Sequence, residues 1–348
     1  CHPGRPSAAL QELQSVLVRG SNLRKDHPLF AQRVRQAAKR GCKVFAINAQ
    51  VQDWALPVTA SAVATKDWAQ ALADIAVAVA QAKGVPAPVV GGTAPAQAQA
   101  IAQALLAGER KAILLGNAAA HHGHAAQLLA LAQWIGEQTG ATVGYLTEAA
   151  NTVGAQWVQA QPQKDGKNAG EMLTGAIKAA ILLNTEPAFD AAAGAKGLEQ
   201  ADMVITLSPF KANLDISDVL LPVAPFTETS GTFVNAEGRV QSFHAVVKPL
   251  GETRPAWKVL RVLANLLELP GFDYESSQDV LTAAIGAETK EVPSALRSNI
   301  TKVAAKVPEN EAAEPVAASI YQLDGIVRRA TSLQLTADAR LAREGGAA

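Results

Sequence analysis

A short polar stretch, ETSGTFVNAEGRVQ at residues 228–241, stands between two apolar runs and concentrates groups that can bond strongly. Carboxylates, amides and a guanidinium this close together can form charge-assisted hydrogen bonds that join two parts of a protein. The side chains able to do so are Glu228, Asn235, Glu237 and Arg239. They form a structural clamp in one interpretation and merely order a turn in the other, and the sequence leaves both open.

The same stretch predicts a β-hairpin. Strands are expected at 232–234 and 240–247, with a turn at 235–238. Gly238 suits a turn position with positive φ, which glycine adopts without a steric penalty. If Gly231 has a positive φ, its replacement by valine is expected to disrupt the hairpin and lower its stability.

Three histidines in HHGH invite a metal interpretation, but their spacing argues against it. His121, His122 and His124 fall at the start of a predicted helix, where they cannot easily converge on one ion. The two cysteines, Cys1 and Cys42, are far apart and cannot supply the roughly four thiolates of an iron–sulfur cluster. We therefore expect no metal on this chain, and Cys42 is expected to be a small buried residue.

Small polar residues follow several predicted strands. Ligands of open parallel sheets lie beyond the carboxyl ends of the strands, where small residues let a phosphate approach the backbone. The residues concerned are Gly20, Ser21, Asn22, Asn117 and Asn184. None belongs to a G-x-G-x-x-G or P-loop pattern, so these residues can equally well be ordinary strand ends.

The elements that position these groups alternate between strands and helices. Continuous apolar runs predict strands at 15–19, 43–48, 111–117, 141–146, 178–187, 201–210 and 217–222. Periodic apolar residues predict helices at 28–40, 66–82, 122–138 and 253–271, the last as a core helix. This alternation favours an α/β fold, doubly wound, with mainly parallel sheets in Rossmann-like lobes.

We divide the chain into three parts. Residues 1–90 form a first Rossmann-like segment, 91–250 a second Rossmann-like lobe with the hairpin, and 251–348 a helical segment and tail. Within the tail, residues 318–342 place apolar side chains on one helical face, so this segment is expected to dock on a partner or on the body.

Composition excludes several functional classes. The 348 residues are 49% hydrophobic and 18% charged, with 31 basic and 31 acidic side chains. A neutral chain without a basic block has no electrostatic footprint for nucleic acid. No run of about 18 apolar residues predicts a transmembrane helix. The chain begins at Cys1, inside what looks like running sequence, which predicts a fragment or a processed product.

The region around the hairpin resembles the large subunit of the molybdopterin oxidoreductase superfamily. SDVLLPVAPFTETSGTFVNAEGRVQ at 217–241 is similar to that family's acidic strand, its Glu and its GT-F-x-N-x-EGR-x-Q pattern. VLVRGSNLRKDHPLFAQRVRQAAKRGCKVFAIN at 16–48 resembles its Rossmann segment. Carried over from the resemblance, with no cofactor expected on them, the vestigial cleft residues are Gly20, Ser21, Asn22, Asn117, Asn184, Glu228, Gly231, Thr232, Asn235 and Arg239.

Within the superfamily, the sequence is most similar to the large iron–sulfur subunit of the bacterial NADH-quinone oxidoreductase, respiratory complex I, in its C-terminal, molybdopterin-oxidoreductase-like part. The segments at 112–156, at 208–243 and at 320–339 carry that similarity. The resemblance implies a scaffold part, without catalytic residues, of an enzyme that transfers electrons from NADH to quinone and translocates protons. It implies 2Fe-2S and 4Fe-4S clusters in a preceding segment, other peripheral-arm subunits as partners, and a peripheral location on the cytoplasmic side of the bacterial inner membrane.

Two other functions stay open. The first is a catalytic molybdenum or tungsten oxidoreductase subunit, similar to formate dehydrogenase, with a pterin dinucleotide in the cleft. Cations near the strand ends are few for its two phosphates: Arg19, Arg24, Lys25 and Lys211. The second is a non-enzymatic interaction module that docks through its tail.

Overall fold

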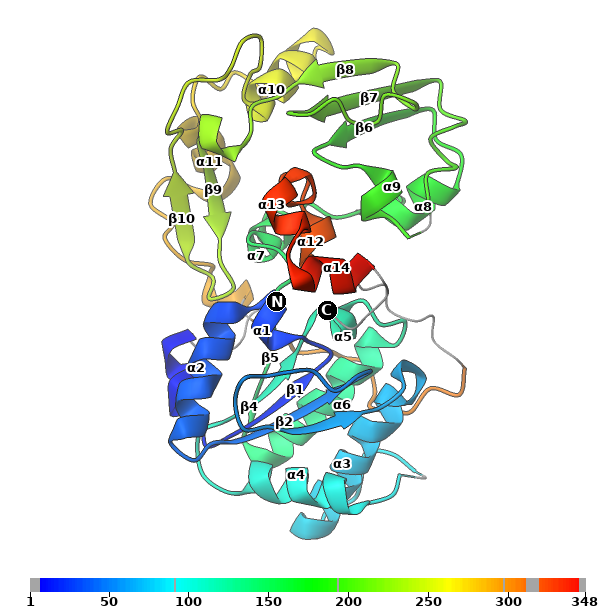
Figure 1. Ribbon diagram of the computed structural model, residues 1–348, viewed down its shortest axis with the longest axis vertical. Coiled ribbons are helices and arrows are strands. Elements are labelled where there is room, and N and C mark those ends of the chain that lie inside the picture. Colours follow the sequence, from blue (N-terminus) through cyan, green and yellow to red (C-terminus); the bar gives the residue numbers. More distant parts are fainter. Residues whose placement is uncertain (1–6, 91, 193, 297, 311–318, 344–348) are drawn as a thin grey trace.

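Two α/β lobes make up most of the protein, and the tail lies between them (Figure 1). The structure, a computed structural model, describes residues 7–90, 92–192, 194–296, 298–310 and 319–343. The predicted α/β fold with mainly parallel sheets is confirmed. Among the described residues, no helix combines the length and the apolar character needed to span a membrane.

The first lobe is built on a five-stranded parallel sheet in the order β3-β2-β1-β4-β5. Its strands are β1 (Ser15–Arg19), β2 (Lys43–Asn48), β3 (Thr59–Ala62), β4 (Lys111–Leu115) and β5 (Thr142–Tyr145). Because β4 and β5 pair in this sheet, the boundary placed at residue 90 falls inside the first lobe. The strand predicted at 111–117 therefore continues the sheet of the first lobe instead of beginning a second sheet.

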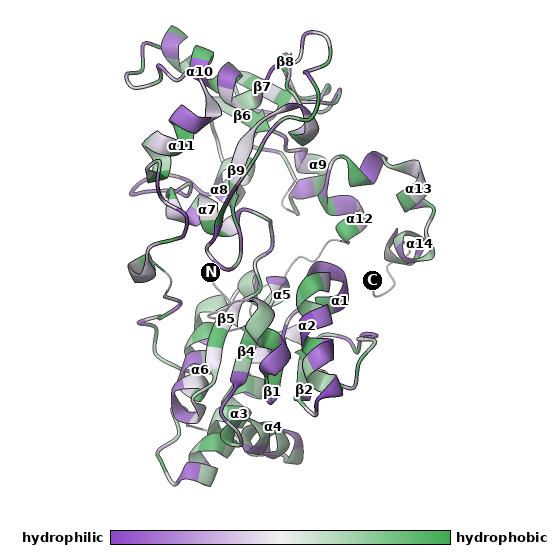
Figure 2. Ribbon diagram, turned by 90° about the vertical axis from the view of Figure 1, so that its left-hand side faces the viewer, coloured by the Kyte–Doolittle hydropathy of each residue, from purple (hydrophilic) through white to green (hydrophobic). Residues whose placement is uncertain are grey.

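Helices cover both faces of this sheet, which explains why β1 and β4 are buried along their whole length. They are α1 (Leu23–Asp26), α2 (Pro28–Lys39), α3 (Trp68–Lys83), α4 (Ala96–Leu106), α5 (Asn117–Ala120) and α6 (Ala125–Thr139), with short 3₁₀ turns at Ser7–Glu12 and Thr65–Asp67. On one face, Val16 and Val18 pack with Val34 of α2. On the other, Leu17 packs with residues of α3, α4 and α6. Figure 2 shows the resulting hydrophobic interior of this lobe.

The second lobe has a three-stranded parallel sheet in the order β6-β7-β8. Its elements are α7 (Thr152–Trp157), α8 (Ala169–Thr174), β6 (Ala179–Leu183), α9 (Pro187–Asp190), β7 (Met203–Ser208) and β8 (Val219–Pro222). One face is packed, with Leu182 and Val204 against Leu198. On the other face, Ile181 and Met203 stay 48% and 42% exposed.

The predicted hairpin forms, with β9 (Gly231–Val234) antiparallel to β10 (Val240–Phe243). A 3₁₀ turn at Phe226–Glu228 precedes it, and α10 (Ala256–Leu266), α11 (Ser277–Ile285) and a turn at Ser294–Leu296 follow. The expected core helix at 253–271 is corrected: in α10 only Ala264 is buried, and Leu266 is 76% exposed. The periodic apolar residues of α10 therefore form a helix face that is only partly buried.

The tail consists of short pieces instead of one continuous helix. They are α12 (Ile320–Leu323), a 3₁₀ turn at Val327–Arg329, α13 (Thr331–Gln334) and α14 (Ala337–Arg343). Gln334 holds the pieces together, because its Nε2 donates to the carbonyls of Tyr321 and Val327 at 2.9 Å each. Docking of the tail on the body, one of the two expected alternatives, is what the structure contains.

Candidate functional site

The carboxyl ends of β1 and β4 meet in a close contact that only small residues allow. A Cβ on Gly116 would lie 2.3 Å from Ser21 Cβ and 2.5 Å from the Gly20 carbonyl oxygen. Gly20 has φ +66°, and a Cβ there would lie 2.6 Å from the nitrogen of Ala119. Gly116 N donates to Arg19 O at 2.8 Å, and this contact joins the two loops. The small residues predicted at these strand ends therefore pack the loops against each other.

An internal carboxylate already engages the loop after β1. Asp26 Oδ2 accepts from Asn22 N at 3.0 Å and from Ser21 Oγ at 3.4 Å. Ser21 N donates to Asn48 Oδ1 at 3.1 Å. Burial raises the pKa of Asp26, and the positive field of His27 and these hydrogen bonds partly counter the shift. Asp26 thus holds the donors that an anionic ligand of this loop would use.

Arg19, at the end of β1, is completely buried, and its guanidinium nitrogens have no hydrogen-bond partner among the residues that the structure describes. The guanidinium carbon lies 4.5 Å from the centre of the Trp68 ring. Burial lowers the pKa of Arg19 well below its usual value, because the charged form has lost its hydration. A buried cation without hydrogen bonds is costly and uncommon, so it marks a candidate anion-binding group.

The three histidines have separate partners, and His122 shares the Trp68 ring with Arg19. His121 Nε2 lies 2.6 Å from Glu148 Oε2, and that hydrogen bond raises the pKa of His121. His122 stacks on Trp68, and its Nε2 lies 3.0 Å from Thr65 O. His124 is buried, with Nε2 unpartnered. Across the part of the chain that the structure describes, no group of three or more His, Cys, Asp or Glu side chains is placed to hold a metal ion.

Cys42 is buried at the start of β2, at the edge opposite the loops described above. Burial raises the pKa of its thiol to about 11. The expected role as a small buried residue is confirmed.

Asn117 and Asn184 occupy comparable places in the two lobes. Asn117 begins α5 after β4, and its Oδ1 is buried without a hydrogen-bond partner in the described part of the chain. Asn184 follows β6 with φ +52°, and its nitrogen donates to Leu207 O at 2.9 Å. A buried acceptor without a partner, such as Asn117 Oδ1, is an available ligand contact.

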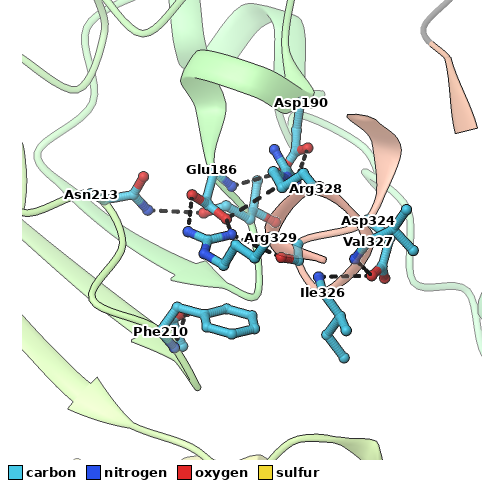
Figure 3. A network of polar contacts seen from close by, with 12 residues as sticks. Glu186, Asp190, Phe210, Asn213, Asp324, Ile326, Val327, Arg328 and Arg329 are labelled. Atoms are coloured by element: carbon cyan, nitrogen blue, oxygen red, sulfur yellow. Dashed lines mark hydrogen bonds and ion pairs between the residues drawn. The ribbon is translucent and has the colours of Figure 1, made fainter. Parts of the chain in front are cut away.

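The carboxyl edge of the second sheet carries an acidic pair that the sequence analysis missed. Glu186 follows β6, Asp190 ends α9, and both bind arginines of the tail (Figure 3). Hydrogen bonds from Arg329 hold the pKa of Glu186 below its usual value. A Glu and an Asp after a strand are too common for their type alone to have indicated this contact.

The hairpin residues do not join this edge. Glu228 Oε2 accepts from Leu250 N at 2.9 Å and lines an open groove of about 600 Å³ with Trp257 and Lys258. Thr232 Oγ1 lies 2.9 Å from Ser242 Oγ, across the hairpin. Asn235 Oδ1 accepts from the nitrogens of Glu237 and Arg239 at 3.0 Å each, so Asn235 orders the turn.

Two details of the hairpin prediction need correction. Gly231 does not have a positive φ; a Cβ there would instead lie 2.7 Å from the ring of Phe243. The positive φ belongs to Gly238, at +83°, as predicted. The only ion pair recorded for Arg239 among the described residues is with Glu237, at 3.7 Å, and the arginine side chain is 61% exposed.

The hairpin stretch contacts both lobes. Glu237 Oε1 accepts from Ser7 N of the first lobe at 2.7 Å, and Val234 N donates to Asn151 Oδ1, before α7 of the second lobe, at 2.8 Å. The hairpin therefore does bridge segments that are far apart in the sequence, but through Glu237 and Val234 instead of Arg239.

Comparisons with known proteins agree with this architecture. A family model described as "Molybdopterin oxidoreductase" matches residues 4–266. The chain is 39% identical over 77 residues to a putative formate dehydrogenase of Staphylococcus aureus, which is 22% of this chain and 8% of that protein. It is 40% identical over 70 residues to a probable oxidoreductase of Bacillus subtilis, covering 20% and 7% of the two chains. The aligned part of this chain therefore spans less than a tenth of the length of these curated relatives.

Among solved structures, acetylene hydratase from Pelobacter acetylenicus has a TM-score of 0.52 at 15% identity. The similarity covers 82% of this chain and 53% of that one, and at this identity it supports the fold alone.

The Staphylococcus aureus and Bacillus subtilis relatives overturn the assignment to a cofactor-free scaffold of complex I, because they are named as a putative formate dehydrogenase and a probable oxidoreductase. They favour the catalytic alternative that the sequence analysis left open.

Proposed function

Because the chain belongs to the molybdopterin oxidoreductase family, we propose that it is part of a catalytic molybdenum or tungsten oxidoreductase similar to formate dehydrogenase. In this proposal the two lobes hold a pterin dinucleotide at the carboxyl ends of their strands. When bound, the metal and its pterin would supply the two-electron redox chemistry. The chain's own contribution is to bind, orient and enclose that group.

The observation that carries the proposal is the unpartnered guanidinium of Arg19. It lies at the carboxyl edge of the first sheet, where an anionic ligand of an open α/β sheet is expected. A phosphate would supply the acceptors that its buried N–H groups lack. Asn117 Oδ1, at the end of the neighbouring strand, can accept a hydrogen bond from an N–H or O–H group elsewhere on the same ligand.

Two neighbouring groups complete the donor set. Lys25 lies in α1, directly after the β1 loop, and its side chain is 18% exposed. The Ser21 hydroxyl, now bonded to Asp26, can donate to a ligand instead. These residues fit a ligand that bears phosphate, and the expectation of a chain without any cofactor gives way to this proposal.

No residue of this chain is assigned as the protein ligand of the metal. Cys42 is unsuitable, because it is buried at the opposite edge of the first sheet and its pKa is about 11. The chain's role in the reaction is therefore cofactor retention. The iron–sulfur clusters in a preceding segment and the partner subunits stay predictions.

The test is the cofactor content of the whole protein, purified from a host that makes molybdenum cofactor. We expect molybdenum or tungsten in stoichiometric amount with pterin, measured by elemental analysis and by pterin fluorescence after denaturation. The variant Arg19→Met should retain about tenfold less pterin, whereas Arg35→Met, an exposed change on α2, should retain it fully. Absence of both metal and pterin from the unaltered protein would refute the proposal.

A further inference from the structure

Two carboxylates and two aromatic rings form a notch at the carboxyl edge of the second sheet. Its members, which we call the acidic notch, are Glu186, Phe189, Asp190 and Phe210. Glu186 caps the start of α9, Phe189 and Asp190 lie within that helix, and Phe210 follows β7. Figure 3 shows Glu186, Asp190 and Phe210 around two adjacent arginines of the tail.

Arg329 makes two parallel hydrogen bonds to one carboxylate and stacks on an aromatic ring, which a guanidinium can do and an ammonium cannot. Its Nη1 donates to Glu186 Oε1 at 2.7 Å, and its Nη2 donates to Glu186 Oε2 at 2.8 Å. The guanidinium carbon lies 4.3 Å from the centre of the Phe210 ring. Lysine can offer neither the parallel pair of donors nor the flat stacking surface.

Arg328 fills the other half of the notch. Its Nη2 donates to Asp190 Oδ1 at 2.8 Å, and its guanidinium carbon lies 4.9 Å from the centre of the Phe189 ring. The side chains of Arg328 and Glu186 are only 9% and 10% exposed, so water screens these charges little. Arg328 Nε also lies 4.0 Å from Glu186 Oε1, so Glu186 pairs with both arginines, while each guanidinium stacks on its own aromatic ring.

The acidic notch, with the two arginines in it, lies at the edge of the second sheet where a ligand of that lobe is expected to bind. Glu186 and Phe210 follow neighbouring parallel strands at their carboxyl ends, the usual ligand edge. The tail passes close to them, since a Cβ on Gly325 would lie 3.5 Å from Glu186 Oε1 and 3.6 Å from the Phe210 ring. The tail also reaches the first lobe, where Asp338 pairs with Lys25 after β1.

We propose that the acidic notch is a binding site for two adjacent arginines, and that residues 319–343, the strap, occupy it reversibly and close the ligand edges of both lobes. The closing role rests on the proposed function, because it assumes a ligand at those edges. The recognition of arginine rests only on the contacts described above. The occupant of the acidic notch is this chain's own strap, and the notch binds the guanidinium of arginine in preference to the ammonium of lysine.

The first experiment measures hydrogen exchange of strap peptides in the full protein. In Arg328→Ala/Arg329→Ala, amides of residues 319–335 should exchange about tenfold faster, because their anchors on the notch are gone. Arg340→Ala, a change in the same tail away from the notch, is the matched control and should leave exchange unchanged. Equal exchange in the double variant and the unaltered protein overturns the proposal.

A second variant separates recognition from misfolding. Glu186→Gln keeps the shape of the notch and should release the strap in the same way, whereas Glu199→Gln, on an exposed residue of the same lobe, should not. Arg329→Lys keeps the charge but loses the parallel donors, so it should also speed exchange. Protection retained in Arg329→Lys would overturn the selection of guanidinium over ammonium.

The third experiment supplies the occupant in trans. A labelled peptide of residues 319–335 should bind the Arg328→Ala/Arg329→Ala protein, measured by fluorescence anisotropy, and the same peptide with both arginines replaced by lysine should bind about tenfold more weakly. Equal binding of the two peptides overturns the notch as an arginine site.

The closing role has its own readout, with guanosine diphosphate as the probe because a nucleoside diphosphate carries the two phosphates of the proposed dinucleotide. The double variant should bind the nucleotide about tenfold more tightly than the unaltered protein, because the strap no longer competes. If the strap is released but neither protein binds nucleotide, the closing role and the proposed cofactor site fail together while the notch stands. If both proteins bind equally, the cofactor site stands and the closing role fails.

Discussion

Replacement of Arg19 by methionine should stabilise the free chain. Moving a charged group from water into the protein interior costs several kcal/mol. The hydrogen bonds that normally offset this cost are absent at Arg19 among the described residues. Stacking on Trp68, with the guanidinium carbon 4.5 Å from the ring centre, returns about 2 kcal/mol. Methionine has a similar length and no polar atom to satisfy, so the free energy of unfolding should rise by about 1–3 kcal/mol.

The assay is urea unfolding followed by tryptophan fluorescence, in a buffer without phosphate. Arg35→Met is the control, because that arginine is exposed on α2; its effect should stay within about 0.5 kcal/mol. A destabilisation above about 1 kcal/mol in Arg19→Met would refute the reasoning, since it would mean that the guanidinium already has acceptors in the free chain. Stabilisation of the free chain together with loss of pterin retention is the combination expected of a group kept for binding.

Three further predictions concern the hairpin and the thiol. Gly231→Val should lower the free energy of unfolding by about 1–3 kcal/mol, because its Cβ would lie 2.7 Å from the Phe243 ring; an unchanged unfolding curve would contradict this packing. Arg239→Ala should cost under about 1 kcal/mol, since its ion pair with Glu237 is exposed, and a double-mutant cycle should find coupling of at most about 1 kcal/mol. The Cys42 thiol, with a pKa of about 11, should react slowly with iodoacetamide at pH 8 in the native chain, and its rate should rise as the pH approaches 11; rapid labelling at pH 8 would show that the site is not buried.

Strands β1, β2 and β4 could be predicted from the sequence because they are continuous apolar runs that end beside glycine or asparagine, whereas β3 (Thr59–Ala62) and α4 (Ala96–Leu106) were not predicted. The strand predicted at 15–19 coincides with β1, and the helix predicted at 28–40 with α2. What failed was the grouping of strands, since β1 and β4 are paired although some 90 residues separate them. Hydrophobic periodicity reports on one element and its buried face, not on which sheet the element joins.

The candidate site was less accessible to sequence reasoning for a related reason. Arg19 could be recognised as a cation near a strand end, but its burial and lack of partners depend on Trp68, which begins a distant helix. Glu186 and Arg329 meet across 143 positions in the chain, and neither has an unusual neighbourhood in the sequence. For Gly231, the condition of a positive φ is not met, and the need for a small residue comes instead from a ring on the facing strand.

The position of the strap in the chain has a consequence for synthesis on the ribosome. The sheet of the second lobe is complete once Pro222 has been made, whereas Arg329 comes about 100 residues later. At roughly 5–20 residues per second, this interval lasts about 5–20 s. During that time both lobes can fold with their carboxyl edges uncovered, so the nascent chain offers a period for loading a ligand that ends when the arginines arrive.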